Sequence, residues 1–179
     1  MKLLSWSCWG LGNPCAVRAL RQLIKVHCPD IVFLMETKLS EIDKNVPFKL
    51  CSDILPNYLL VNCSRNKGKR YGGLAMIWKD DVKLTIINQN HMSIDCYVSS
   101  YDFSSNWRAI GVYGYPYTSQ KKLTCNFINS LSNDNHSDRW LIFGDFNLIV
   151  NNSEKIGGNP IEQNLSDYFQ NTLAQNDLK

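Results

Sequence analysis

The stretch that decides the fold class runs from residue 2 to residue 37 and reads KLLSWSCWGLGNPCAVRALRQLIKVHCPDIVFLMET. Residues 2–7 have the pattern of a short strand, and residues 31–35 form the continuous apolar run of a strand buried on both faces. Between them Asn13 suits a helix N-cap and Pro14 suits the first helical position, after which apolar residues recur at helical spacing. The stretch therefore predicts a strand–helix–strand unit.

The rest of the chain is rich in strand-like runs and poor in helices. A weak helical pattern covers about residues 41–55, and clearer ones cover residues 119–133 and 165–175. The strand-like runs are YLLVNC (58–63), GLAMIW (73–78), VKLTII (82–87), SIDCYVSS (93–100), RAIGVYGY (108–115) and WLIFGDFN (140–147). Without a repeat or a linker, the pattern predicts one mixed α/β domain over residues 1–179.

The bulk composition fits a packed domain. Apolar residues make up 44% of the chain and charged residues 20%, which is enough to build a core. The net charge of +3 permits an anionic partner without requiring one. Seven cysteines form a scattered, odd set with no CxxC pair, which predicts small buried thiols in a reducing compartment.

The sequence contains no sign of a membrane or secretory segment. No run approaches the ~18 apolar residues of a membrane span. The N-terminus, MKLLSWSCWG, has too few apolar residues for a signal-peptide core. We therefore expect an intracellular protein that does not associate with a membrane.

Polar side chains follow three of the apolar runs at the point where each run ends. Glu36 follows one, Tyr113 ends another, and Asp145 and Asn147 follow the third. In layered α/β folds ligands bind at strand ends, because a rigid sheet holds side chains there in fixed positions. A single carboxylate at such a point is usually a loop cap, whereas several that converge indicate a site.

These residue types suit phosphodiester hydrolysis. Glu36 is a hard oxygen ligand for Mg²⁺, and Asp145 can orient or deprotonate an attacking water. Asn147 and Tyr113 can donate hydrogen bonds to phosphate oxygens without adding repulsive charge. Because Asp145 and Asn147 are two residues apart, an extended backbone would place both on one side.

A cluster of basic residues lies in the stretch SRNKGKRYGG (64–73). We expect a short Gly-containing loop that carries four cations and one aromatic side chain: Arg65, Lys67, Lys69, Arg70 and Tyr71. Such cations can follow a phosphate backbone, and the tyrosine can stack on a base. The alternative is a solvated hairpin loop whose charges only keep it in solution.

Six segments resemble the endonuclease/exonuclease/phosphatase superfamily, and most closely the endonuclease domain of plant LINE-type non-LTR retrotransposons. They occur in the family order and cover almost the whole chain. They are KLLSWSCWGLGNPCAVRALRQLI, PDIVFLMETK, GGLAMIW, GVYGYP, WLIFGDFNLIV and EKIGG. GDFN after an apolar strand together with an upstream ET at a strand end is the most specific part of this resemblance.

The resemblance implies a four-layer α/β sandwich, in which two mixed β-sheets pack face to face and helices lie outside. It implies divalent-metal-dependent phosphodiester cleavage with Mg²⁺ or Mn²⁺, a DNA partner, and hence a nuclear location, and it indicates no protein partner or oligomer. Glu36 matches the metal-binding glutamate and Tyr113 the tyrosine that contacts the scissile phosphate. Asp145 and Asn147 match the pair that positions the nucleophilic water and the phosphate.

The first strand departs from the family pattern at Ser7. Relatives read Ser-Trp-Asn, and that asparagine contacts the metal-site network, whereas this chain reads Ser5-Trp6-Ser7. Ser7 can donate a hydrogen bond but is shorter and lacks the carbonyl acceptor. If the asparagine helps to orient Glu36, its loss would typically cost ~10–100-fold in activity.

The second departure concerns the C-terminal part. The family carries further strands and a Ser-Asp-His motif there, and none of the three histidines of this chain follows Ser-Asp. We therefore expect a domain that is incomplete at the C-terminus, with an unpaired sheet edge and weak or absent activity.

Three functions follow as hypotheses. The first is a DNA endonuclease of the LINE type. The second is a non-catalytic, degenerate remnant that at most binds nucleic acid. The third is a small-molecule or lipid phosphatase of the same superfamily, which the segment SWSCWGLGNP disfavours because it is typical of plant LINE elements.

Overall fold

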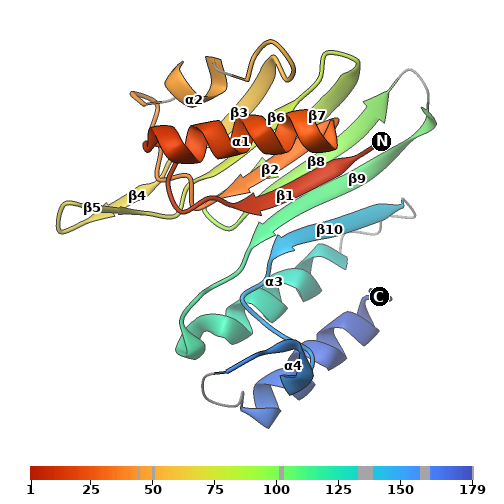
Figure 1. Cartoon of the computed structure of the whole chain (residues 1–179). Helices are drawn as coiled ribbons and strands as arrows, with labels where there is room; N and C mark the ends of the chain where they lie inside the picture. The colour runs from red at the N-terminus through yellow and green to blue at the C-terminus, as the bar shows by residue number, and fades with distance from the viewer. Residues whose placement is uncertain (44, 50, 101–102, 133–138, 158–161, 179) are drawn as a thin grey trace. The chain divides into compact units, whose positions relative to one another are not determined.

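The computed structural model describes residues 1–179 except 44, 50, 101–102, 133–138, 158–161 and 179. The chain divides into two compact units, each described by itself below (Figure 1). Unit 1 comprises Met1–Val112 and Asp138–Gly144, and unit 2 comprises Tyr113–Ser137 and Asp145–Lys179. The single domain inferred from the sequence stays a prediction.

The first sheet of unit 1 is mixed and has the order β1-β2-β6-β3. β1 and β2 are parallel, while β6 is antiparallel to both β2 and β3. The strands are β1 (Leu3–Ser7), β2 (Ile31–Met35), β3 (Asn57–Val61) and β6 (Leu74–Trp78). This topology brings the ends of β1, β2 and β3 and the start of β6 to one edge of the sheet.

Helix α1 (Pro14–His27) connects β1 to β2 and lies across this sheet (Figure 1). As the sequence predicts, the Asn13 side chain caps it by accepting a hydrogen bond from the Cys15 amide at 2.9 Å. Leu20 and Ile24 are fully buried in a core with residues of β2 and β6. The strand–helix–strand prediction is therefore confirmed.

The second sheet has the order β10-β9-β8-β7. β7 pairs antiparallel with β8, and β8 pairs antiparallel with β9. β10 runs parallel to β9, as two backbone hydrogen bonds in the same direction show. The Arg108 amide donates to the Arg139 carbonyl at 2.9 Å, and the Gly114 amide donates to the Asp145 carbonyl at 2.7 Å. The strands are β7 (Val82–Gln89), β8 (Ser93–Ser100), β9 (Phe103–Tyr113) and β10 (Trp140–Asp145).

The two sheets pack face to face within unit 1. Cys96 Sγ of β8 lies 3.9 Å from Met76 Sδ of β6. Phe33 of β2 meets the edge of Phe143 of β10, with ring centroids 5.5 Å apart. A Cβ on Gly111 would lie 2.7 Å from the Phe33 ring, so only glycine lets β9 approach this closely. The predicted α/β fold with two packed mixed sheets is thus confirmed.

Unit 1 also contains a short helix and a hairpin that the sequence describes poorly. The helix expected over residues 41–55 is wrong in extent: α2 covers only Asn45–Lys49, and turns surround it. Ser40 and Asp43 close the preceding turn by a backbone hydrogen bond of 2.8 Å. The basic stretch, predicted as a short Gly-containing loop, forms a hairpin of strands β4 (Ser64–Asn66) and β5 (Lys69–Tyr71).

Unit 2 is built on two helices, α3 (Lys121–Ser132) and α4 (Gln163–Gln175), as the sequence predicts. They are joined by hydrogen bonds from Tyr168 to Asn126 at 2.8 Å and from Asn176 to Asn129 at 2.7 Å. Two short 3-10 helices accompany them, η1 (Thr118–Gln120) and η2 (Asn152–Glu154). Among the described residues, no strand follows β10.

All seven cysteines are free thiols, of which four are buried. The buried ones are Cys8, Cys51, Cys96 and Cys125, whereas Cys15 and Cys28 are exposed. Within the described part of the chain, no helix is long and apolar enough to cross a membrane.

Replacing Gly111 with alanine should destabilise the packing of the two sheets. The added Cβ meets the Phe33 ring at 2.7 Å, so we expect a loss of about 1–3 kcal/mol in the free energy of unfolding, measured by urea denaturation. Gly12→Ala is the matched control, because nothing lies within 4 Å of its added Cβ. Equal stability of the two variants would contradict the close sheet contact.

Candidate functional site

Glu36 stands at the sheet edge where β1 and β2 both end. It follows β2 directly, has a left-handed backbone (φ 57°), and its side chain is 21% exposed. Because Ser7 pairs with Met35 in the parallel register of β1 and β2, Ser7 lies beside the residue that precedes Glu36. The structure thus brings Ser7 and Glu36 to the same edge.

The loop after β1 is hydrogen-bonded to the backbone on both sides of Glu36. The amide and the thiol of Cys8 donate to the Met35 carbonyl at 3.0 and 3.1 Å, and the Leu11 amide donates to the Thr37 carbonyl at 2.9 Å. Burial raises the pKa of the Cys8 thiol to about 11, so it remains a protonated donor at neutral pH. Glu36 is therefore held between two fixed carbonyls.

The start of β6 holds the same segment from its other side. The Thr37 amide donates to the Gly73 carbonyl and the Lys38 amide to the Gly72 carbonyl, both at 3.0 Å. Thr37 is completely buried, and Lys38 has a left-handed backbone (φ 54°). The turn that carries Glu36 is thus fixed by contacts on both sides.

Lys38 is a site residue to which the sequence reasoning gave no role. Its ammonium lies 3.7 Å from Glu36 Oε2, and its side chain is 36% exposed. The spacing Glu-x-Lys at a strand end is the only signal for this pair in the sequence. The ammonium partly neutralises the Glu36 carboxylate, and in water it can move aside for another cation.

The donor set around Glu36 suits Mg²⁺ and not a closed metal cage. Mg²⁺ is usually bound by one or two carboxylates, with water and substrate phosphate completing the octahedron. Across the described residues, no group of three or more His, Cys, Asp or Glu side chains can hold a metal ion. A partly exposed carboxylate with a hydroxyl residue on the adjacent strand fits a water-rich Mg²⁺ site.

The basic stretch is a hairpin that emerges from the same sheet edge. Its two-residue turn has Lys67 and Gly68 at φ 47° and 78°, the left-handed conformations that a type I′ turn requires. Arg65, Lys67 and Lys69 are exposed, and Tyr71 is 51% exposed. These four side chains are therefore open to a partner.

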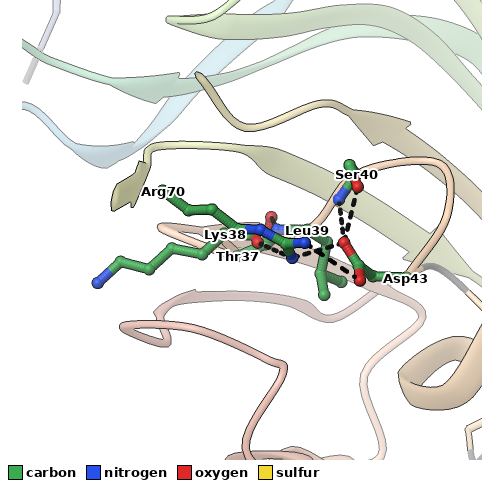
Figure 2. Close-up of polar contacts among 6 residues, drawn as sticks. All are labelled: Thr37, Lys38, Leu39, Ser40, Asp43 and Arg70. Carbon is green, nitrogen blue, oxygen red and sulfur yellow. Dashed lines mark hydrogen bonds and ion pairs between the residues drawn. The ribbon is translucent and has the colours of Figure 1, made fainter. Parts of the chain in front are cut away.

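Arg70 differs from the other basic residues, because its guanidinium turns back toward the Glu36 segment (Figure 2). It donates to Asp43 Oδ2 at 2.6 Å, to Asp43 Oδ1 at 3.4 Å and to the Lys38 carbonyl at 3.3 Å. The Arg70 guanidinium already binds a carboxylate and a carbonyl. The role of Arg70 in binding nucleic acid stays a prediction, and in this structure its guanidinium is held by these intramolecular contacts.

Asp43 is held in place by Ser40 as well as by Arg70 (Figure 2). The Ser40 hydroxyl and amide donate to Asp43 Oδ2 at 2.7 and 3.2 Å. The Ser40 hydroxyl and, after it, the Arg70 guanidinium hold the pKa of Asp43 below its ordinary value. The carboxylate is thus ionised at neutral pH, and the Arg70–Asp43 pair clamps the hairpin to the segment that follows Glu36.

The second group of candidate residues lies in unit 2, where β9 and β10 end side by side. The Asn147 amide donates to Asp145 Oδ1 at 2.9 Å, and its side-chain nitrogen donates to the Gly114 carbonyl at 2.8 Å. Tyr113 is the half-buried last residue of β9, and Gly114 follows it. The Gly114 amide donates to the Asp145 carbonyl at 2.7 Å. Tyr113, Asp145 and Asn147 are therefore brought together.

The physical reason given above for the Asp145–Asn147 pair is wrong. β10 ends at Asp145, and Asn147 has a left-handed backbone (φ 53°), so the two do not share one side of an extended strand. They form an Asx turn, in which the Asp145 side chain accepts the amide hydrogen two residues on. The turn still keeps both side chains close to the end of β9.

A close backbone approach and aromatic packing support this turn. A Cβ on Gly114 would overlap the Phe146 carbonyl, so the position directly after β9 accepts only glycine. The Phe146 ring packs on Phe169 of α4 with centroids 6.0 Å apart. The Thr124 hydroxyl of α3 accepts a hydrogen bond from the Tyr115 amide at 3.0 Å. Helix α4 therefore packs against the Asp145 turn, and α3 holds the segment that follows β9.

Taken together, these features define a class: a layered α/β protein with two packed mixed sheets, a glutamate after β2 and an Asp–Asn turn after β10. The Endonuclease/Exonuclease/phosphatase family model matches residues 4–173, so the chain belongs to this family and has its phosphodiesterase fold. No curated protein matches the chain.

Several solved structures share the fold at low sequence identity. A 3′ phosphatase, NExo from Neisseria bound to product DNA hairpin, is 19% identical with a TM-score of 0.65, covering 97% of this chain and 70% of its own. An AP endonuclease from Archaeoglobus fulgidus is 13% identical with a TM-score of 0.65, covering 98% and 70%. D. rerio TDP2 complexed with single strand DNA product is 18% identical with a TM-score of 0.56, covering 83% and 61%.

Replacing Arg70 with alanine should release the hairpin from the Glu36 segment. We expect severalfold faster hydrogen exchange of the β4 and β5 amides, because the contacts to Asp43 and the Lys38 carbonyl are lost. Arg65→Ala is the matched control, since it removes the same charge from the paired position of β4, where the side chain is exposed. Equal exchange in both variants would contradict the clamp.

Proposed function

We propose that this chain carries the catalytic machinery of a divalent-metal-dependent DNA phosphodiesterase of the LINE retrotransposon type. The observation that carries the proposal is the Asx turn at the end of β10, which fixes Asp145 and Asn147 beside the end of β9. A family member that keeps this turn and a glutamate after β2 retains the residue types needed for phosphodiester hydrolysis.

Each residue has a distinct role in this proposal. Glu36 would hold Mg²⁺ or Mn²⁺, and the bound ion offsets the negative charge that develops on the phosphate. Asp145, which accepts the Asn147 amide hydrogen, would orient and deprotonate the attacking water. Asn147 has a second side-chain N–H for a phosphate oxygen, and the Tyr113 hydroxyl donates to the same phosphate.

Nucleic acid is the substrate class that the surface beside Glu36 favours. Arg65, Lys67 and Lys69 are exposed on a hairpin that Arg70 fixes to the Glu36 segment. Cations held in this way attract a phosphate backbone in a salt-dependent manner. DNA products bound to the Neisseria phosphatase and to D. rerio TDP2 support the same choice. The hypothesis of a small-molecule or lipid phosphatase has no comparable support, because the Neisseria phosphatase is itself bound to a DNA product.

Ser7 and Lys38 favour slow catalysis. Ser7 lies next to Met35 but lacks the amide oxygen of the family asparagine, and the Lys38 ammonium competes for the Glu36 carboxylate at 3.7 Å. Both features are consistent with a weak enzyme. They also keep the non-catalytic remnant as the second candidate function.

Nicking of supercoiled plasmid in Mg²⁺ tests the proposal. We expect slow nicking by the chain and none by Asp145→Ala, because that variant has no carboxylate to activate water. If the chain does not nick, or if Asp145→Ala nicks equally fast, the assignment is wrong and the remnant hypothesis is favoured.

Ser7→Asn provides the matched gain-of-function control in the same assay. It restores the amide beside the Glu36 segment, so we expect nicking to rise by about tenfold. Asp81→Asn serves as the neutral control, because Asp81 is exposed and lies at the other edge of the sheet from Glu36. It follows the end of β6, where Trp78 pairs with Ile31, the first residue of β2.

A further inference from the structure

Trp9 is the most exposed tryptophan side chain of the described residues, and its position beside Glu36 is fixed. Its relative exposure is 81%, whereas Cys8 and Leu11 on either side are buried at 6% and 1%. Trp9 itself has a left-handed backbone (φ 53°), which is rare for a bulky residue. The chain thus keeps a large apolar ring in water in a conformation that costs free energy.

The loop that carries Trp9 cannot move independently of the Glu36 segment. Cys8 is hydrogen-bonded to the Met35 carbonyl and Leu11 to the Thr37 carbonyl, so the loop is attached on both sides of Glu36. A Cβ on Gly10 would lie 3.4 Å from Lys38 Cδ, so the Gly10 backbone packs against that side chain. The exposed ring is therefore carried by a loop whose backbone is fixed beside the Glu36 segment.

The surroundings of Trp9 point to a nucleic-acid base and not to an apolar protein surface. The hairpin with Arg65, Lys67 and Lys69 is attached to the same Thr37–Lys38 segment through Gly72 and Gly73. It adds a second exposed aromatic side chain, Tyr71. Cations with interleaved aromatic rings are the usual composition of surfaces that bind single-stranded nucleic acid.

We propose that Trp9 stacks on an unpaired base next to the phosphodiester that Glu36 serves. The inference rests on the proposed function and adds a substrate class, namely nucleic acid with an unpaired nucleotide at the cleavage position. In a duplex each base face is covered by its neighbours, so a fixed tryptophan ring can stack only on a base that is unpaired or extruded. Trp9 is therefore a specificity-determining residue.

Binding to strands with and without bases tests this inference separately from catalysis. The probes are a short single-stranded DNA and a strand of equal length made of abasic nucleotides, both measured by fluorescence anisotropy in a chelator, which prevents cleavage. Stacking is worth ~1–3 kcal/mol per base, so the chain should prefer the strand with bases by about 5- to 100-fold.

The variants assign this preference to Trp9. In Trp9→Ala the preference for the strand with bases should fall at least fivefold, because the stacking energy is lost. The same variant should bind the abasic strand as tightly as the unmodified chain does. Trp9→Phe should retain most of the preference, and Ile87→Ala, which removes another exposed apolar side chain, should retain all of it.

Three results are decisive. An undiminished preference for bases in Trp9→Ala would overturn the inference while leaving the proposed function intact. A preference that Trp9→Ala abolishes supports the inference, even if the plasmid assay shows no nicking. Failure of the unmodified chain to bind either strand would contradict nucleic acid as the substrate, and the stacking role with it.

Discussion

The turn that follows β2 is the constraint on which unit 1 depends. Glu36 and Lys38 both have left-handed backbones, with φ of 57° and 54°, a conformation that costs roughly 1–3 kcal/mol per residue without compensation. Four backbone hydrogen bonds compensate for it, two from the loop after β1 and two to the start of β6. Because these partners come from the end of β1 and the start of β6, both strands next to β2 determine the position of the Glu36 backbone.

The same turn explains why the hairpin and the Trp9 loop share one surface with Glu36. β1 and β2 are parallel and β6 is antiparallel to them, so their connections emerge at a single edge. The Arg70–Asp43 pair then fixes the direction of the hairpin. Backbone contacts act in the same way in unit 2, where Gly114, the residue after β9, approaches Phe146 closely and positions the Asp145 turn. In both units backbone contacts place the functional side chains.

Apolar periodicity and local capping were enough to predict most of the elements. The helix that begins at Pro14 and the buried strand Ile31–Met35 follow directly from their patterns, and the resemblance supplied the packing of the two sheets. The prediction of a helix over residues 41–55 was wrong in extent, because Ser40, Asp43 and Arg70 stabilise a turn at its start. Arg70 and Asp43 are 27 residues apart, and no local pattern in the sequence predicts such a pair.

The residues of the candidate site were easier to predict than the conformations and contacts of their side chains. The types at positions 36, 113, 145 and 147 were read from strand ends and family motifs, but the Asx turn depends on a backbone conformation that the spacing does not reveal. Likewise, four cations in ten residues look equivalent in the sequence, and only the structure separates Arg70 as a clamp from the exposed Arg65, Lys67 and Lys69.

The proposed metal ligand is Glu36, and Mn²⁺ binding followed by electron paramagnetic resonance tests this role. Mn²⁺ is a spectroscopic substitute for Mg²⁺ at oxygen-rich sites. We expect the chain to bind Mn²⁺, Glu36→Gln to weaken binding by about tenfold or more, and Asp81→Asn to leave it unchanged. Equal Mn²⁺ affinity in the unmodified chain and in Glu36→Gln would show that Glu36 is not a metal ligand.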